Sequence, residues 1–189
     1  MLKLIKDRRT IRFYEQKAVP EEVLRQMIDG ARVTSCAGNM QQLRYVVAAS
    51  ADMAEKVFAQ TAWGAMVRPK RNPEWGKNAA MAYIAVLGPS DAAPMVHADA
   101  GAAIQSMQLV AQANGLGCCW LGAIQREPLR KLLQVSPSQQ VMYLLAVGYP
   151  AEKPASEDVP AGASLRYYLD DQNVIHVPKL APADVARWC

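Results

Sequence analysis

The chain has 189 residues, a length that suits one domain with a substantial core and is short for two. Its composition is 51% apolar and 20% charged, as in an ordinary globular protein, and its formal net charge is +4. No apolar run reaches the roughly 18 to 20 residues that cross a bilayer, and no signal-peptide pattern is visible at the amino end. We therefore expect a cytoplasmic protein without a membrane partner.

The excess positive charge lies in the first twelve residues, which hold five basic side chains and one acid. The rest of the chain is balanced, which argues against a nucleic-acid-binding surface and favours one small anion held at one site. The four cysteines match neither a CxxC motif nor a disulfide framework. His97 and His176 stand far apart without an acidic ligand motif, so we expect no metal site.

The amino-terminal half predicts helices alternating with short strands. Pro20 and two following acids open a helix whose apolar residues recur at helical spacing as far as Ala31. Small and polar residues at 34–42 predict a loop. Arg44 to Ala49 then predicts a strand, and about Asp52 to Thr61 a second helix.

The middle of the chain begins with residues 63–78, where two prolines and two glycines predict a long, irregular segment. Loops of this length in compact domains are usually functional or mobile. Ala80 to Leu87 predicts a buried strand. Val96 to Asn114 predicts an alanine-rich, nearly uncharged helix without a solvent face, which should lie in a core or against another subunit.

The last third predicts a strand at Cys118 to Leu121, a short helix at Pro128 to Leu133 and a strongly apolar strand at Val141 to Val147. Residues from about 151 to 189 are punctuated by prolines and have few core-forming side chains, so we expect an extended arm that packs on a partner subunit. The pattern predicts a single α+β domain over 1–189, with a mixed sheet between layers of helices, an α/β/α sandwich.

Three stretches could form a ligand site. Residues 8–12 carry three guanidiniums, whose planar forks match phosphate oxygens, but such a string is also common at a solvated helix start. In residues 35–41 small side chains would let the backbone approach a flat ligand; alternatively this is a polar turn with Gly38 and Asn39 at positive φ. Residues 115–122 either expose backbone N–H groups at a turn or form a helix cap and a core strand.

The sequence resembles the FMN-dependent nitroreductase family in the order and spacing of these three stretches and of the later Val147-Gly148-Tyr149-Pro150. That family typically reads Arg-Arg-Ser-Ile-Arg, then Ser-Ala-Gly-Asn-x-Gln, then Gly-Leu-Gly-x-x-Trp-Ile-Gly after a long central helix. The resemblance covers about residues 5–182. It implies a nitroreductase-like fold, with a mixed, mainly antiparallel sheet flanked by helices, in an intertwined homodimer.

The resemblance also implies FMN bound between the two chains. It assigns to FMN the residues Arg8, Arg9, Thr10, Arg12, Ser35, Cys36, Ala37, Asn39, Gln41, Gly122, Ala123 and Lys179. The first four match phosphate and ribityl contacts. Residues 35–39 match a loop that the second subunit lays against the isoalloxazine ring, with Gln41 supporting it. Gly122 and Ala123 match a turn whose N–H groups face the N5 and O4 edge, and Lys179 a basic residue that returns to the phosphate.

Two departures from the family pattern bear on the substrate. Ser35-Cys36 replaces the common Pro-Ser, and Gln42-Leu43 replaces the common Pro-Trp. Cys36 is either a small packed residue or a redox or substrate-facing one. Trp63 and Trp75 lie in the segment that covers the active site in relatives, where they either line the substrate cleft or simply pack.

The implied activity is that of an FMN-dependent oxidoreductase. Hydride would pass from NADH or NADPH to flavin N5 and on to a small electron-poor acceptor such as a nitroaromatic or a quinone. No side chain need act as an acid or base there, so no catalytic residue is assigned. The alternative is a flavin-binding, sensing or flavin-modifying module of the same fold. A nucleic-acid binder would need exposed aromatics among the arginines, where only Phe13 and Tyr14 lie near.

Overall fold

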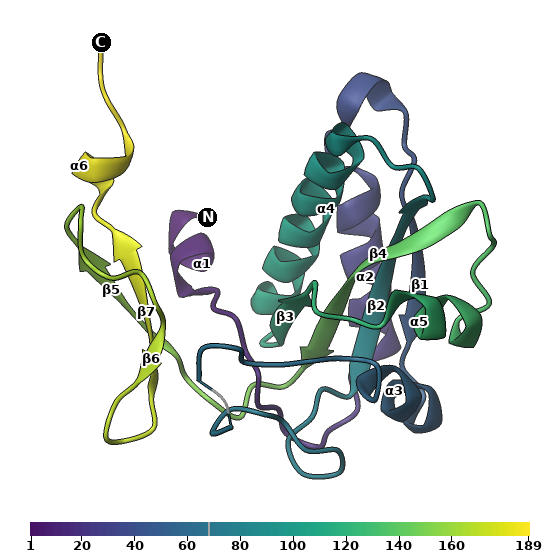
Figure 1. Cartoon of the computed structure of the whole chain (residues 1–189), viewed down its shortest axis with the longest axis horizontal. Helices are drawn as coiled ribbons and strands as arrows, with labels where there is room; N and C mark the ends of the chain where they lie inside the picture. Colours follow the sequence, from purple (N-terminus) through teal and green to yellow (C-terminus); the bar gives the residue numbers. More distant parts are fainter. Residues whose placement is uncertain (68) are drawn as a thin grey trace.

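The centre of the molecule is a four-stranded antiparallel sheet. This computed structural model describes residues 1–67 and 69–189. The strands lie in the order β1-β2-β4-β3, and β2 and β4 are the two central ones (Figure 1). Their bounds are β1 Arg44–Ala48, β2 Ala82–Pro89, β3 Gly117–Leu121 and β4 Gln139–Gly148. Every pair of neighbouring strands in this sheet is antiparallel.

Helices cover both faces of the sheet, as the predicted α/β/α sandwich requires. On one face, α2 (Glu21–Arg32) and α4 (Pro94–Ala113) pack against each other and on the sheet. The other face carries α3 (Ala51–Phe58) and α5 (Arg126–Leu132). Because β2 is covered on both faces, its residues are almost all buried, which explains its uninterrupted apolar sequence.

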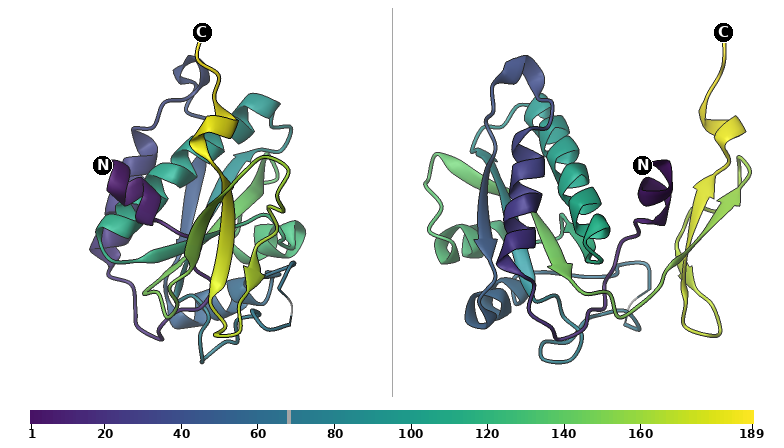
Figure 2. Two further views of the ribbon diagram at one scale, coloured as in Figure 1. Left: turned by 90° about the vertical axis from the view of Figure 1, so that its left-hand side faces the viewer. Right: turned by 180° about the vertical axis from the view of Figure 1, so that it is seen from behind.

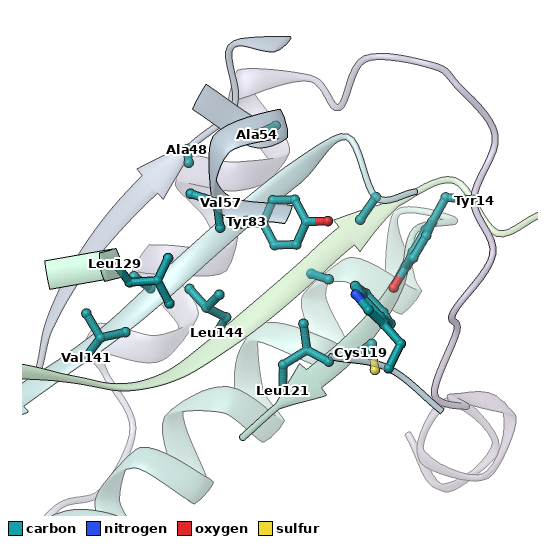
Figure 3. Packing of buried hydrophobic residues seen from close by; sticks show 14 of the residues in the cluster. Tyr14, Ala48, Ala54, Val57, Tyr83, Cys119, Leu121, Leu129, Val141 and Leu144 are labelled. Atoms are coloured by element: carbon teal, nitrogen blue, oxygen red, sulfur yellow. The ribbon is translucent and has the colours of Figure 1, made fainter. Parts of the chain in front are cut away.

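The second face also receives a segment from the amino end of the chain. Figure 3 shows its Tyr14 at one end of the buried cluster, beside Cys119, and Leu129 and Val141 at the other end. The Tyr14 side chain is fully buried, and its hydroxyl donates to the carbonyl of Ile11 at 2.6 Å. The amino-terminal segment is therefore part of the core rather than a loose extension.

The carboxyl-terminal residues form an arm that stands off from the body (Figures 1 and 2). It is a small sheet in the order β5-β7-β6, followed by a single helical turn. The elements are β5 Ala155–Val159, β6 Tyr168–Leu169, β7 Ile175–Leu180 and α6 Pro182–Val185. A short amino-terminal helix, α1 (Leu2–Asp7), lies between the arm and the body in Figure 1 and in the right-hand view of Figure 2.

Most of the predicted elements are confirmed to within a few residues. The sequence did not indicate α1 or the strands of the arm, because these elements bury little apolar surface and show no clear hydrophobic period. Within the central sheet, the sole parallel contact of the described residues is an isolated bridge between Thr10 and Cys118. The predicted mixed character thus comes from the amino-terminal segment and not from a parallel strand.

The expectation that α4 lacks a solvent face is wrong for the single chain. Ala98, Ala102 and Ala113 are exposed on it, while Ile104 and Met107 are buried against the sheet. The exposed face of α4 carries small apolar side chains, which suit contact with another subunit. That second alternative stays a prediction. Within the part of the chain that the structure describes, no helix is long and apolar enough to cross a membrane.

Replacing Gly148 by alanine should destabilise the fold. A Cβ there would lie 2.8 Å from Cδ1 of Tyr14, which has no free space to move into. Overpacking of this kind costs about 1 to 3 kcal/mol, measurable by urea unfolding at a fixed protein concentration. Gly101→Ala is the matched control, because its Cβ would meet Trp120 at an ordinary 3.5 Å. Unchanged stability in Gly148→Ala would contradict the close packing of Tyr14 on β4.

Cys118 and Cys119 of β3 should not react with thiol reagents in the folded protein. Burial raises the pKa of Cys119 to about 12 and also raises the pKa of Cys118, so both remain protonated at a pH of about 8. Cys36 is half-buried and Cys189 exposed. Titration with a disulfide reagent should therefore modify at most two thiols in the native protein and four in denaturant. A double variant Cys36→Ser, Cys189→Ser should not react until it unfolds; rapid native modification of it would refute the burial.

Candidate functional site

The arginine-rich segment runs in extended form beside the edge strand β3. Helix α1 ends where Arg8 adopts extended angles, and the Ile11 N–H donates to the carbonyl of Cys118 at 2.9 Å. Further along, the Tyr14 N–H donates to the carbonyl of Asn78, also at 2.9 Å. The segment does not continue α1, so the alternative of a charged helix start does not hold for residues beyond Arg8. Its side chains project from a fixed, strand-like backbone.

Gly117 permits this arrangement. A Cβ at Gly117 would collide with the side chain of Ile11, so the segment can approach β3 this closely because the strand begins with glycine. Ile11 is itself buried and anchors the segment, while its neighbours Thr10 and Arg12 are half-buried. Ile11, in the middle of the arginine cluster, therefore holds the neighbouring arginines in place.

Two of the arginines carry donor atoms that are buried and unused. Nε of Arg8 and Nη1 of Arg12 have no hydrogen-bond partner within residues 1–67 and 69–189. Burial lowers the pKa of the Arg8 guanidinium, and the adjacent charge of Arg9 lowers it further. Buried, unpaired charge is costly, and an anion with several oxygens would offset that cost. The donors thus fit the phosphate of the expected cofactor.

Arg9 differs from its two neighbours. Its guanidinium donates to the hydroxyl of Ser156 in β5 and to the carbonyl of Arg8. It therefore joins the arm to the amino-terminal segment in this conformation. Arg12 also faces the arm, with its guanidinium carbon 4.8 Å from the centre of the Tyr167 ring. Of the predicted phosphate ligands, Arg8 and Arg12 are the two whose buried donors lack a partner in the part of the chain that the structure describes.

A buried carboxylate that the sequence analysis did not single out holds this segment in place. Oε1 of Glu152 accepts from the backbone N–H groups of Arg12, at 2.5 Å, and Phe13, at 3.2 Å. Its Oε2 lies 3.4 Å from Nη1 of Arg71, an ion-pair contact between side chains that are 6% and 11% exposed. The sequence offers only a lone glutamate after Tyr149-Pro150 and a lone arginine in the irregular segment. Neither residue stands in a motif that would predict this ion pair.

The 35–41 loop forms a single 3-10 turn, η1 (Ala37–Asn39), with Gly38 and Asn39 both at positive φ. The polar-turn interpretation of these two residues is therefore confirmed, and it leaves their ligand-binding role a prediction. The Ala37 N–H donates to Oδ1 of Asp99 in α4 at 3.0 Å, and Gln41 donates through its amide to Asn39 at 3.0 Å. Gln41 is therefore bonded to the loop, and its part in flavin binding stays a prediction.

Within one chain the loop and the arginines are far apart. The loop is tied to Asp99, near the start of α4, whereas the arginine segment contacts Gly117 and Cys118, just beyond its end. About 20 Å of helix separates the two, and Figure 1 shows η1 as the blue turn at the top of the molecule. The structure does not bring these two predicted parts of the site together in a single chain.

The Gly122–Ala123 turn follows β3, and both residues are exposed. It is fixed by residues 60–62, because the Ala62 N–H donates to the carbonyl of Ala123 and the Gln125 N–H to that of Gln60, both at 2.9 Å. Lys179 is exposed on β7, where it lies opposite Asp158 within the arm. The turn thus lies at the end of the strand that the arginines follow, while Lys179 belongs to the arm.

The two tryptophans of the irregular segment pack into the second face of the sheet. Trp63 is 5% exposed, and its ring centre is 6.4 Å from that of Phe58. Trp75 is half-buried at 5.9 Å from the same ring. Of the two open interpretations, packing accounts for Trp63. Arg68, in the same predicted segment, lies outside the described residues.

Comparison with known proteins agrees with the fold and the sequence motifs. The family model described as "Nitroreductase family" matches residues 5–149. A protein of Methanothermobacter thermautotrophicus named "Putative NADH dehydrogenase/NAD(P)H nitroreductase" is 30% identical over 165 residues, covering 84% of this chain and 82% of the relative. A Desulfovibrio desulfuricans protein solved in complex with FMN is 30% identical with a TM-score of 0.66, covering 85% of this chain and 91% of its own.

A further solved structure supports the fold alone. It is a nitroreductase family protein of Clostridium novyi, 21% identical, with a TM-score of 0.68 over 79% of this chain and 84% of that one. The family match extends over most of the chain and includes the arginine segment, the 35–41 loop and the Gly122–Ala123 turn. The chain belongs to the nitroreductase family.

Proposed function

We propose that this chain is an FMN-dependent oxidoreductase that uses NADH or NADPH to reduce a small electron-poor acceptor such as a nitroaromatic or a quinone. The observation that carries the proposal is the pair of buried donors, Arg8 Nε and Arg12 Nη1, which lack acceptors in the described chain. Family membership and the FMN bound to the Desulfovibrio relative support the choice of ligand. When bound, FMN would supply the redox chemistry by accepting hydride at N5 and passing electrons to the acceptor.

The residues of the chain would bind and orient the cofactor. Arg8 and Arg12, with Thr10 between them, would grip the phosphate and the ribityl chain from the edge of β3. The backbone of Gly122 and Ala123, at the other end of the same strand, would face the polar edge of the flavin ring. Preorganised N–H donors there stabilise negative charge that develops on the ring. In this assignment the protein contributes no acid or base side chain.

The site would need two copies of the chain. The 35–41 loop lies too far from Arg8 and Arg12 to touch the same flavin, so a second copy would supply it. Two features support a homodimer. Ala98, Ala102 and Ala113 are exposed on α4 together with the larger apolar Met95, and the arm stands off the body of its own chain. A dimer would carry two FMN sites, each formed from both chains.

Arginine variants test the phosphate assignment. Arg8→Ala and Arg12→Ala should each remove a charge-assisted contact and weaken FMN binding by about 1.5 to 3 kcal/mol, or about 10- to 150-fold in Kd. Arg9→Ala should cost less, since its guanidinium is already bonded to Ser156. Fluorescence titration of the apoprotein with FMN measures each constant. The matched control is Arg25→Ala, an exposed arginine paired with Glu21 in α2; an effect equal to that of Arg8→Ala would contradict the assignment.

Turnover separates the reductase from a flavin sensor. The flavin-loaded wild-type protein, mixed anaerobically with excess NADH or NADPH in a stopped-flow instrument, should lose its absorbance near 450 nm, with rates of about 1 per second or faster. Addition of a quinone in excess over the remaining nicotinamide should then restore the absorbance. Persistent oxidised flavin with both nicotinamides would favour the sensing or flavin-modifying alternative.

A further inference from the structure

We propose that Glu152 and Arg71 form a positioning pair for the cofactor phosphate. This inference rests on the proposed function and adds two residues to it. Glu152 would hold the backbone at Arg12 so that the arginine guanidinium remains free for phosphate. Arg71 would pair with the Glu152 carboxylate. Through this ion pair, FMN binding would depend on the irregular segment at residues 63–78.

The first step concerns what Glu152 binds. A buried carboxylate this close to an arginine would ordinarily form an ion pair with the guanidinium and neutralise it. Instead, Oε1 of Glu152 accepts from the backbone N–H groups of Arg12 and Phe13. The Arg12 guanidinium lies over the Tyr167 ring with Nη1 unused in the described chain. The carboxylate therefore orients the residue without consuming its charge.

The second step concerns what holds Glu152. Its Oε2 faces Nη1 of Arg71 at 3.4 Å, so the carboxylate charge has a buried counter-charge other than Arg12. The Arg71 guanidinium carbon lies 4.8 Å from the centre of the Phe13 ring, and Nη2 donates to the carbonyl of Asn173 in the arm. Arg71 thus contacts both the segment that Glu152 orients and the arm. Arg71 is also the cationic side chain that the structure pairs with the Glu152 carboxylate.

The third step concerns connection to the rest of the irregular segment. The Met66 N–H donates to the hydroxyl of Tyr167 at 3.3 Å, and the Tyr167 ring is the one beneath the Arg12 guanidinium. Residues 60–62, just before the segment, fix the Gly122–Ala123 turn. A change in the conformation of residues 63–78 can therefore affect the proposed phosphate-binding arginines through Arg71 and Tyr167.

Comparison of FMN with riboflavin tests the pair, because riboflavin lacks the phosphate. Glu152→Ala should weaken FMN binding by about five- to a hundredfold and leave riboflavin binding within about twofold. Glu152→Gln should have a smaller effect in the same direction, since its amide oxygen still accepts from the backbone. If Glu152 acted through its charge alone, both variants would tighten FMN, because a negative charge near a phosphate would be gone. The direction of the change therefore separates positioning from simple charge.

Variants of Arg71 complete the experiment. Arg71→Met should lower the ratio of FMN to riboflavin affinity, and Arg71→Lys should restore part of it by keeping the charge beside Glu152. Glu127→Ala, an exposed glutamate paired with Arg130 in α5, is the control for removal of a carboxylate. Circular dichroism checks that each variant is folded. Should Glu152→Ala fail to fold, Glu152→Gln and the Arg71 pair carry the test.

Three outcomes would overturn the inference. FMN and riboflavin binding could weaken equally in folded Glu152 and Arg71 variants, which would make the pair merely structural. FMN binding could instead tighten when Glu152 is replaced, which would make the effect one of charge. A wild-type protein that bound riboflavin as tightly as FMN would refute the phosphate assignment of the proposed function itself, and so is distinguishable from failure of the pair.

Discussion

The carboxylate of Glu152 is the interaction on which the arrangement of the site depends. It joins the amino-terminal segment, the irregular segment at 63–78 and the beginning of the arm, which are widely separated in the sequence. A buried charge of this kind is costly unless it is both paired and hydrogen-bonded. Here two backbone N–H groups donate to Oε1, and the Arg71 guanidinium supplies the counter-charge to Oε2, which has no hydrogen bond within residues 1–67 and 69–189. The buried pair fixes the backbone at Arg12. A fixed backbone orients the arginine that would bind the phosphate.

Glycines determine where that backbone can lie. Gly117 and Gly148 pair with each other across β3 and β4, and each leaves room for one anchoring side chain of the amino-terminal segment. Ile11 fills the space at Gly117, and Tyr14 the space at Gly148. These two anchors flank Arg12 and place it at the edge of the sheet. The motif residues of the segment and the glycines of the strands are thus parts of one packing arrangement.

In the proposed assignment, a single chain holds only part of the FMN site. The arginines and the Gly122–Ala123 turn lie along β3, while the 35–41 loop lies near the start of α4. A flat cofactor placed along β3 would be exposed on one side. In the proposed dimer, the second copy would cover it with its loop. The same contact would bury the small apolar face of α4 and apolar residues of the arm such as Leu165 and Val185, which are exposed in the single chain.

Local sequence was enough to predict α2 from its helical period, and β2, α4 and β4 from their continuous apolar composition. The residues assigned to flavin came from the resemblance to the family. Local sequence also indicated positive φ at Gly38 and Asn39, because turn residues act through their own backbone. It did not predict α1 or the strands of the arm, which depend on contacts more than on pattern. Nor could it separate packing from substrate contact for Trp63, because an aromatic side chain in an irregular segment fits both roles.

What the sequence by itself determined is the family, the layered architecture and the presence of a cluster of phosphate-matching arginines. The tertiary structure decided how those arginines differ, since Arg9 is bonded to Ser156 while Arg8 and Arg12 keep buried donors without a partner among the described residues. It alone brought Glu152 to Arg71, two residues with no motif around them. The physical reason is that burial and pairing of charge arise between segments remote in sequence, whereas hydrophobic period and turn preference act between neighbours.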